Sequence, residues 1–477
     1  MSSRRKPKKQ KNTEYMIITY LFVALFLALM GYIVYFQIVK SEDVINSSYN
    51  NRQELLAEKV VRGSIYSADE KVLAETVVDS DGNEVRNYPY KNVFAHAIGY
   101  NTLGKSGIES QYSFSMLQCD NLLPKRLFRE LIGEKNQGNA LITTYNADLQ
   151  ETAYNALGNY KGAVVALEPD TGKILVMVSK PDYDPNQIAV LWDDLTSGDS
   201  DDSRLLNRAT QGLYPPGSTF KIVTATAYLD QHNNKYTSYE YDCNSKISSD
   251  DITINCYRNK AHGNIDLLTS FAKSCNTSFS NMGLSLDRAE FAATCTRLLF
   301  NQSLPLSKLS SKSSTVVLET DTSDSDVMQT AIGQGKTLMT PMHLAMITSA
   351  IANDGTLMIP YQVDKIKTSD GGTVKTYKSK SYGRLFSKEQ ATILQEFMAA
   401  VVSEGTGTKL QSSKYDAYGK TGSAEYNNEK GKSHSWFTGY AKKDEKKLVV
   451  TVIVEEAGSG SEYAVPVAKK IWDAYFD

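Results

Sequence analysis

The chain has 477 residues, of which 41% are hydrophobic and 22% are charged, and its formal net charge at pH 7 is -2. This length predicts two or three domains rather than a single core. The near-neutral charge argues against nucleic acid as a partner, because proteins that bind nucleic acid carry a basic face.

The amino-terminal segment predicts a basic tail, residues 1–14, followed by one transmembrane helix, residues 15–38. The run from Tyr15 to Phe36 contains no charged residue, and as a helix it is about 33 Å long, enough to cross a bilayer core. The alternative is a cleaved secretory signal, for which the apolar run is too long. Because the tail is cationic, we expect it in the cytoplasm. The residues after the helix are then expected on the extracellular or periplasmic side of the membrane.

Residues 39–140 alternate short β-like runs with turn signals such as Ser80 to Asn83, which predicts a small, mostly β module. The character of the sequence changes near residue 140. Ala147 to Leu157 has helical periodicity, and Gly162 to Ser179 reads as a hairpin of two apolar strands.

The carboxyl-terminal part repeats this pattern of strands and a helix. Ser435 to Ala441 and Lys447 to Glu456 read as strands, and Ala464 to Phe476 reads as a helix. Strands at both ends of residues 141–477 with a helix-rich middle predict an α+β domain, in which helices pack on an antiparallel sheet.

Five cysteines are few for an exported chain. Cys243 and Cys256 flank a short polar stretch, and this spacing is compatible both with a disulfide loop and with two free thiols. Cysteine–histidine spacing typical of a metal site is absent, so the sequence predicts no metal and no organic cofactor.

The first segment with catalytic character is Tyr214 to Lys221, which reads YPPGSTFK. The S-x-x-K pattern occurs three times in the chain, but only the pair Ser218 and Lys221 follows a helix-breaking Pro-Pro-Gly. A serine at the first turn of a helix has a lysine three residues later on the same face. Such a lysine can act as a general base when burial lowers its pKa.

Two further segments complete the set. Ser274-Cys275-Asn276 lies at the end of a helical stretch, where Ser274 can relay a proton and Asn276 can hold Lys221. Lys420-Thr421-Gly422-Ser423 lies on a predicted strand, where Lys420 and Thr421 can bind a substrate carboxylate and Lys420 can lower the pKa of Lys221. The backbone N–H groups of Ser423 and Ser218 can form an oxyanion hole.

The order S-x-x-K, S-x-N, K-T-G is the set of penicillin-binding proteins and serine β-lactamases, and the chain resembles the class B penicillin-binding proteins over nearly its whole length. Further segments carry this resemblance: Arg62 to Ile65, Val72 to Ala74, Gly104 to Tyr112, Ile332 to Gly335, Met339 to Met342 and His434 to Gly439. The resemblance implies a transpeptidase domain, an antiparallel sheet with helices on both sides, standing on a short pedestal.

The resemblance also implies the activity: a peptidoglycan D,D-transpeptidase that cross-links stem peptides through an acyl-enzyme on Ser218 and is inhibited by β-lactams. It implies that Lys221 is the general base, that Ser274, Asn276 and Lys420 assist catalysis, and that Thr421, Gly422 and Ser423 bind substrate. A polytopic glycan polymerase is the expected partner. The process served, which is division, elongation or sporulation, stays open, as do the acceptor amine and the oligomeric state.

Three alternatives remain. A D,D-carboxypeptidase passes the same acyl-enzyme to water but usually lacks a large amino-terminal pedestal. A β-lactamase needs a group that activates the deacylating water, and the sequence shows no clear candidate. A non-catalytic scaffold or β-lactam sensor would have a decayed site or a cytoplasmic signalling domain, whereas here every named catalytic residue is present.

Overall fold

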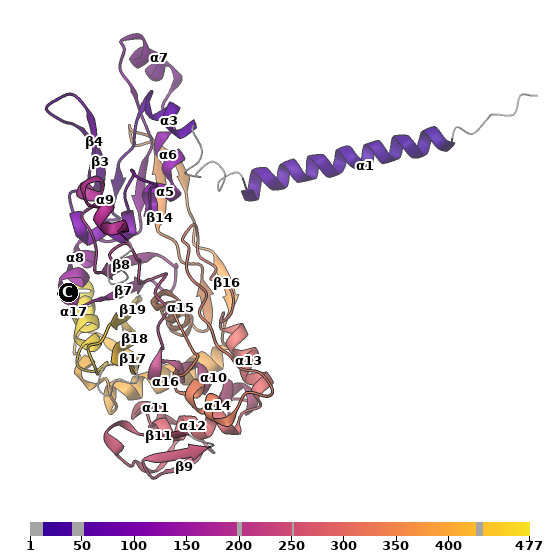
Figure 1. Ribbon diagram of the computed structural model, residues 1–477, viewed down its shortest axis with the longest axis vertical. Coiled ribbons are helices and arrows are strands. Elements are labelled where there is room, and N and C mark those ends of the chain that lie inside the picture. The colour runs from indigo at the N-terminus through magenta and orange to yellow at the C-terminus, as the bar shows by residue number, and fades with distance from the viewer. Residues whose placement is uncertain (1–12, 41–51, 198–202, 250–251, 426–432) are drawn as a thin grey trace, which may run out of the picture.

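The computed structural model describes residues 13–40, 52–197, 203–249, 252–425 and 433–477 (Figure 1). The predicted basic tail, residues 1–14, therefore lies almost wholly outside the described residues. Helix α1 (Thr13–Tyr35) continues into a π-helical turn, η1 (Phe36–Lys40), and projects away from the rest of the chain in Figure 1.

Helix α1 has the properties of a membrane anchor. Its apolar side chains are exposed, and an 18-residue window within Glu14–Tyr35 has a mean hydropathy of 2.5. Within the described ranges it is the one helix long and apolar enough to cross a membrane. An exposed apolar surface of this size is compatible with lipid rather than water as the surrounding solvent.

The pedestal is built around a six-stranded sheet with the order β15-β14-β6-β2-β3-β4. Four of its strands come from the amino-terminal half of the chain: β2 (Ile65–Tyr66), β3 (Val72–Val78), β4 (Glu84–Asn87) and β6 (Ala140–Thr143). The other two, β14 (Val363–Lys367) and β15 (Thr373–Thr376), come from much later in the sequence. The pedestal sheet is therefore not confined to the predicted range of residues 39–140, and the boundary at residue 140 stays a prediction.

Short elements from the same part of the chain accompany this sheet, several of them at the upper end of Figure 1. They are α3 (Arg52–Ala57), the parallel pair β1 (Val60–Val61) and β5 (Asn136–Gln137), η2 (Lys91–Phe94), α4 (Ala95–Ile98), α5 (Gly107–Gln111), α6 (Ser113–Leu117) and α7 (Leu123–Leu131).

A buried ion triad joins two of the segments that carry the family resemblance. Glu109 in α5 is fully buried and accepts hydrogen bonds from Arg62 Nε at 2.6 Å and from Arg86 Nε at 2.7 Å. Burial alone would raise the pKa of Glu109, but the two guanidinium charges outweigh it and lower this pKa. The triad ties α5 to β4 and to the loop before β2.

We expect Glu109→Ala to destabilise the pedestal by about 3–5 kcal/mol, because it leaves two buried guanidinium groups without a counter-charge. The measurement is chemical denaturation of the full chain, monitored by a spectroscopic probe placed in the pedestal. The control is Glu84→Ala, which breaks the half-exposed pair between Glu84 and Lys135 at 2.9 Å and should cost less than about 1 kcal/mol. Equal effects of both variants would contradict a structural role for the triad.

The second sheet has five antiparallel strands in the order β17-β18-β19-β7-β8. They are β17 (Asp416–Glu425), β18 (Ser433–Lys443), β19 (Lys446–Val454), β7 (Gly162–Leu167) and β8 (Ile174–Lys180). Strands from the two ends of the domain meet where β19 pairs with β7. This arrangement confirms the predicted hairpin, the two carboxyl-terminal strands and the α+β plan.

Helices cover both faces of this sheet. The helices α8 (Ala147–Leu157) and α17 (Ala464–Phe476), with the predicted bounds, pack against each other on one face. Helix α15 (Pro341–Ala352), in which every residue is buried, packs on the other face against β19 and β7. Because β7 is buried along its whole length, it reads as a continuous apolar run rather than an alternating one.

A helical region adjoins the β17 edge of the sheet. It contains η4 (Gly217–Phe220), α10 (Lys221–Gln231), α11 (Leu267–Ala272), α12 (Asn276–Ser285), α13 (Arg288–Arg297), α14 (Asp324–Ala331), α16 (Lys388–Ser403) and η6 (Thr408–Leu410). The small strands β9 (Glu240–Cys243), β10 (Lys246–Ser249), β11 (Ile252–Asn255) and β12 (Gly263–Asp266) and the turn η5 (Tyr257–Asn259) form a lobe below it in Figure 1. The remaining elements are η3 (Pro185–Gln187), α9 (Ile188–Thr196), β13 (Thr356–Met358) and β16 (Ser381–Arg384).

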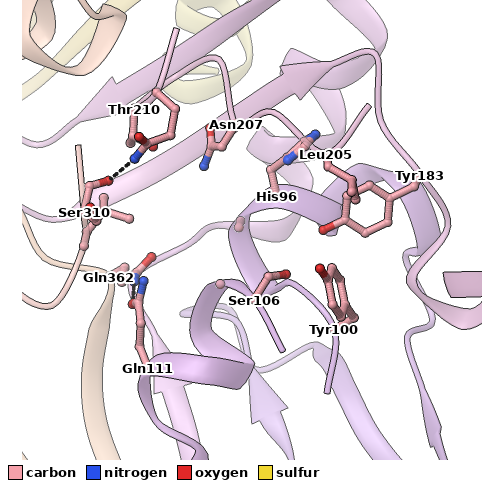
Figure 2. Close-up of a pocket in the computed structure, with 14 residues that line it drawn as sticks. His96, Tyr100, Ser106, Gln111, Tyr183, Leu205, Asn207, Thr210, Ser310 and Gln362 are labelled. Atoms are coloured by element: carbon pink, nitrogen blue, oxygen red, sulfur yellow. Dashed lines mark hydrogen bonds between the residues drawn. The ribbon is translucent and has the colours of Figure 1, made fainter. Parts of the chain in front are cut away.

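A cavity of about 170 Å³ lies where the pedestal meets the transpeptidase-type domain (Figure 2). His96, Tyr100, Gln111 and Tyr183 are among the residues that line it. Gln362, directly before β14, donates a hydrogen bond to Gln111 at the end of α5 beside this cavity. None of the predicted catalytic residues lines this cavity, so it is a feature of the domain junction rather than of the chemistry.

Candidate active site

The turn that carries Ser218 is shaped by two glycines. Gly217 has a φ of +54°, and a Cβ built on it would lie 2.6 Å from the Ser423 carbonyl oxygen. A Cβ on Gly333 would lie 2.2 Å from the Gly217 oxygen, while Gly217 N–H donates to Gly333 O at 2.9 Å. Only glycine fits such close backbone contacts, so Ile332 to Gly335 positions the turn that carries Ser218.

Ser218 and Lys221 lie three residues apart across the junction of η4 and α10. Residues i and i+3 of a 3₁₀ turn lie on the same face, so Ser218 and Lys221 share one face of this turn. Ser218 is half-buried, whereas Lys221 is completely buried. The serine is therefore reachable from outside and the lysine is not.

Lys221 is held by the middle motif. Its Nζ donates to the Ser274 carbonyl oxygen at 2.7 Å, to Ser274 Oγ at 3.2 Å and to Asn276 Oδ1 at 2.8 Å. Ser274 has a φ of +55°, a conformation that non-glycine residues seldom adopt and that often marks functional sites. This backbone allows one residue to offer both its carbonyl and its hydroxyl oxygen to the same ammonium group.

Lys420, which belongs to a different element from Lys221, also donates to Ser274. It lies on the edge strand β17, is completely buried, and donates from Nζ to Ser274 Oγ at 2.8 Å. Ser274 Oγ thus joins Lys221 to Lys420. The structure brings all three predicted motifs together, although they are separated by more than fifty residues in one interval and by more than one hundred in the other.

The two lysines have strongly altered acidities. Burial lowers the pKa of Lys221 to about 7, and the nearby Cys275 and Cys256 side chains partly oppose this shift. Burial, together with the nearby charge of Lys221, lowers the pKa of Lys420 well below its ordinary value. The sequence predicted that Lys420 acts on Lys221; in the structure burial is the main cause for both groups.

The predicted substrate-binding residues are consecutive on β17. Thr421 is buried, and its hydroxyl lies 2.6 Å from that of Thr406, a partner that sequence reasoning missed. Gly422 packs against Thr219, so a Cβ there would lie 3.0 Å from Thr219 Cγ2. Ser423 is half-buried. Since β17 ends its sheet, its outer edge can accept an extended peptide.

Aromatic and charged residues support the loop before Ser218. Trp436 Nε1 donates to Pro215 O at 2.9 Å, and Tyr214 hydroxyl donates to Glu455 Oε1 at 2.6 Å. Arg208 Nε donates to the same carboxylate oxygen at 2.7 Å. Arg208 and Glu455 were not predicted, because nothing in the local sequence connects positions so far apart.

Cys243 and Cys256 are free thiols whose sulfur atoms lie 3.7 Å apart. Of the two possibilities that the sequence left open, the structure has the unbridged one.

Comparisons with known proteins agree with this geometry. Residues 162–473 match the model of the penicillin-binding protein transpeptidase domain, and residues 62–141 match the dimerisation domain of penicillin-binding protein A. The chain is 30% identical to the peptidoglycan D,D-transpeptidase PbpA of Mycolicibacterium smegmatis, over 90% of this chain and 92% of that protein.

Solved structures show the same likeness. The ceftriaxone acyl-enzyme of penicillin-binding protein A from M. tuberculosis matches with a TM-score of 0.80 and 28% identity, covering 88% of this chain and all of that one. The penicillin G acyl-enzyme of the same protein matches with a TM-score of 0.79 and 28% identity, over 87% of this chain and 100% of the other.

Proposed function

This chain belongs to the penicillin-binding protein transpeptidases, and we propose that it cross-links peptidoglycan with Ser218 as the nucleophile. Its activity is that of a serine D-Ala-D-Ala transpeptidase that β-lactams acylate. One observation supports the assignment of residues above all others: Lys221 and Lys420, from two distant motifs, both donate to Ser274 Oγ. Ser218 lies three residues before Lys221, so the base that this network holds is on the turn that carries the serine.

In the acylation step, neutral Lys221 takes the proton from Ser218, whose Oγ attacks the penultimate D-alanine carbonyl. A lysine with a pKa of about 7 is half neutral at neutral pH and so is poised for this task. The backbone N–H groups of Ser218 and Ser423 hold the oxyanion. The terminal D-alanine leaves with a proton that passes from Lys221 through Ser274.

Lys420 and Thr421 bind the carboxylate of the terminal D-alanine. Without substrate, burial keeps the pKa of Lys420 low; a bound carboxylate restores its charge, because an opposite charge within about 4–6 Å favours the protonated amine. The recharged Lys420 then repels a proton on Lys221. Substrate binding would in this way favour the neutral base at the moment that it is needed.

The anchor and the partner complete the proposal. Helix α1 would anchor the chain in the membrane, and the positive charge of the basic tail supports an orientation with the tail in the cytoplasm and the catalytic domain on the outer side. A polytopic membrane protein would polymerise the glycan strands that this enzyme cross-links, as the family resemblance implies.

Transpeptidation is tested by letting an amine and water compete for the acyl group of the acyl-enzyme. The full chain in detergent is given a synthetic donor peptide ending in D-Ala-D-Ala, together with an amine acceptor, and the products are separated by mass spectrometry. We expect the amide product to exceed the hydrolysis product when amine is present. Hydrolysis alone at all amine concentrations would make the enzyme a carboxypeptidase.

A further inference from the structure

Three buried thiols and one imidazole meet beside the active site, and the transpeptidase chemistry uses none of them. Cys243 Sγ lies 3.7 Å from Cys256 Sγ and 3.4 Å from Cys275 Sγ, and Cys256 Sγ lies 3.6 Å from Cys275 Sγ. His262 Nδ1 lies 3.3 Å from Cys243 Sγ. All four atoms lie within 4.8 Å of one another.

These distances are those of a metal site rather than a disulfide. A tetrahedral Zn²⁺ with Zn–S bonds of about 2.3 Å and a Zn–N bond of about 2.0 Å places its sulfurs about 3.8 Å apart and nitrogen about 3.5 Å from sulfur. A disulfide would bring two sulfurs to about 2.0 Å and leave the third thiol over. The cluster is a near-regular triangle of three sulfurs, which a pairwise bond does not explain.

The surrounding lobe has only a small core of its own, beside its packing against α12. Its strands form only two-stranded sheets, β9 with β12 and β10 with β11, and most of their residues are at least partly exposed. Isolated two-stranded sheets are marginally stable. The three cysteines and Ile265 form a small buried cluster of their own, whereas Ile254 of β11 belongs to the main core. A bound metal would supply the stability that so small a core cannot.

We propose that Cys243, Cys256, His262 and Cys275 bind one Zn²⁺ ion, with three thiolate sulfurs and the histidine Nδ1 as ligands. Binding releases the proton of each thiol, so the complex carries a net charge of -1. The Thr277 hydroxyl lies 3.3–3.4 Å from all three sulfurs, and Ser278 N–H donates to Cys275 Sγ at 3.5 Å. These donors, at the amino-terminal end of α12, stabilise the negative sulfurs.

The ion would also position the catalytic middle motif, an inference that rests on the function proposed for that motif. Cys275 stands between Ser274 and Asn276, both of which hold Lys221. Asn276 Nδ2 donates to Asn255 O at 2.9 Å, and Asn255 directly precedes Cys256. The metal would therefore fix Cys275, which directly precedes Asn276 in the chain. It would also fix Cys256, which follows the Asn255 carbonyl that binds the Asn276 side chain.

The first test is metal content. The full chain, purified in detergent under reducing conditions, should contain about one zinc ion per molecule by inductively coupled plasma mass spectrometry. Cys256→Ala should lose the metal, and so should His262→Ala, which removes a half-exposed ring and leaves the buried core intact. Cys119→Ala, outside the cluster, is the matched control and should keep its zinc. A reduced, folded chain that binds no added zinc, or variants that bind it as the parent does, would overturn the proposal.

Cobalt gives an independent readout of the ligands. Co²⁺ exchanged into the site should show the visible bands of a tetrahedral ion and a thiolate-to-metal charge-transfer band. The charge-transfer band should weaken in Cys256→Ala and not in Cys119→Ala. An octahedral spectrum without the thiolate band would contradict this ligand set.

The positioning role has its own measurement. His262→Ala should slow acylation by a β-lactam about 10- to 100-fold, and the Ser218→Ala variant should bind zinc normally although it is not acylated. Zinc content and acylation thus report separately on the metal site and on the proposed nucleophile. A zinc-free His262→Ala enzyme that acylates at the parent rate would disprove the positioning role.

Discussion

Ser218→Ala should abolish covalent labelling by fluorescent penicillin, with a loss of acylation rate of at least about 10⁴-fold, as for other serine nucleophiles. The variant removes one hydroxyl oxygen from a half-buried side chain and leaves Cβ in place, so the fold should be retained. The measurement is the rate of adduct formation in the full chain, with thermal unfolding followed in parallel.

Ser270 offers a matched control for this result, because it begins another S-x-x-K sequence, with Lys273 as its fourth residue. Ser270 is buried and accepts a hydrogen bond from Ser278, while Lys273 is exposed. Ser270→Ala should therefore keep its labelling and lose at most about 1–3 kcal/mol of stability. Labelling that persists in Ser218→Ala would show that the nucleophile is a different residue.

Acylation by a neutral β-lactam should rise about tenfold per pH unit below pH 7 and level off above it. The pKa of Lys221 is lowered to about 7 by burial, and only the deprotonated amine can act as a base, so activity is gained as the pH rises through this value. Lys221→Met removes the base and should slow acylation by about 10²- to 10⁴-fold. The rising limb near pH 7 should vanish with it.

Lys273→Met is the control for this second result, since Lys273 has the same place in an S-x-x-K sequence but lies at the surface. It should leave both the rate and the pH profile unchanged. The Lys221→Met variant leaves Asn276 Oδ1 and the Ser274 carbonyl oxygen without the lysine that donates to them, so its folding must be checked by thermal unfolding. A Lys221→Met enzyme that keeps a rising limb near pH 7 would show that another group is the base.

The sequence predicts well those elements whose cause is local. Helices α8 and α17 have the predicted bounds because each carries an apolar stripe at helical spacing. The hairpin of β7 and β8 follows from two apolar runs around a glycine turn. For the same reason the position of Ser218 at the start of a helix could be inferred from the Pro-Pro-Gly that precedes it.

Features that depend on distant segments could not be inferred in this way. Strands β14 and β15 come from the later part of the chain but pair in the pedestal sheet. Their short, polar sequences do not indicate which strands they pair with. The φ of +55° at Ser274 is imposed by tertiary contacts, since serine itself does not prefer it. The contacts of Lys221 and Lys420 with Ser274 likewise depend on the tertiary fold and cannot be inferred from the distances between these residues in the sequence.

The cysteine cluster shows the same limit. Its four residues are 13, 6 and 13 positions apart, unlike the close pairs by which zinc sites are usually recognised. The sequence therefore predicted no metal. The four side chains meet only because β9 pairs with β12 and because the turn after α11 returns Cys275 to the end of β9.

The most direct test of Ser218 as the nucleophile is a peptide map of the full chain after reaction with penicillin, with a time course of release. A single adduct on the peptide that contains Ser218, stable for far longer than it took to form, is the predicted result. An adduct on another residue, or no adduct on folded enzyme, would contradict the account; rapid hydrolysis of the adduct would make the protein a β-lactamase instead.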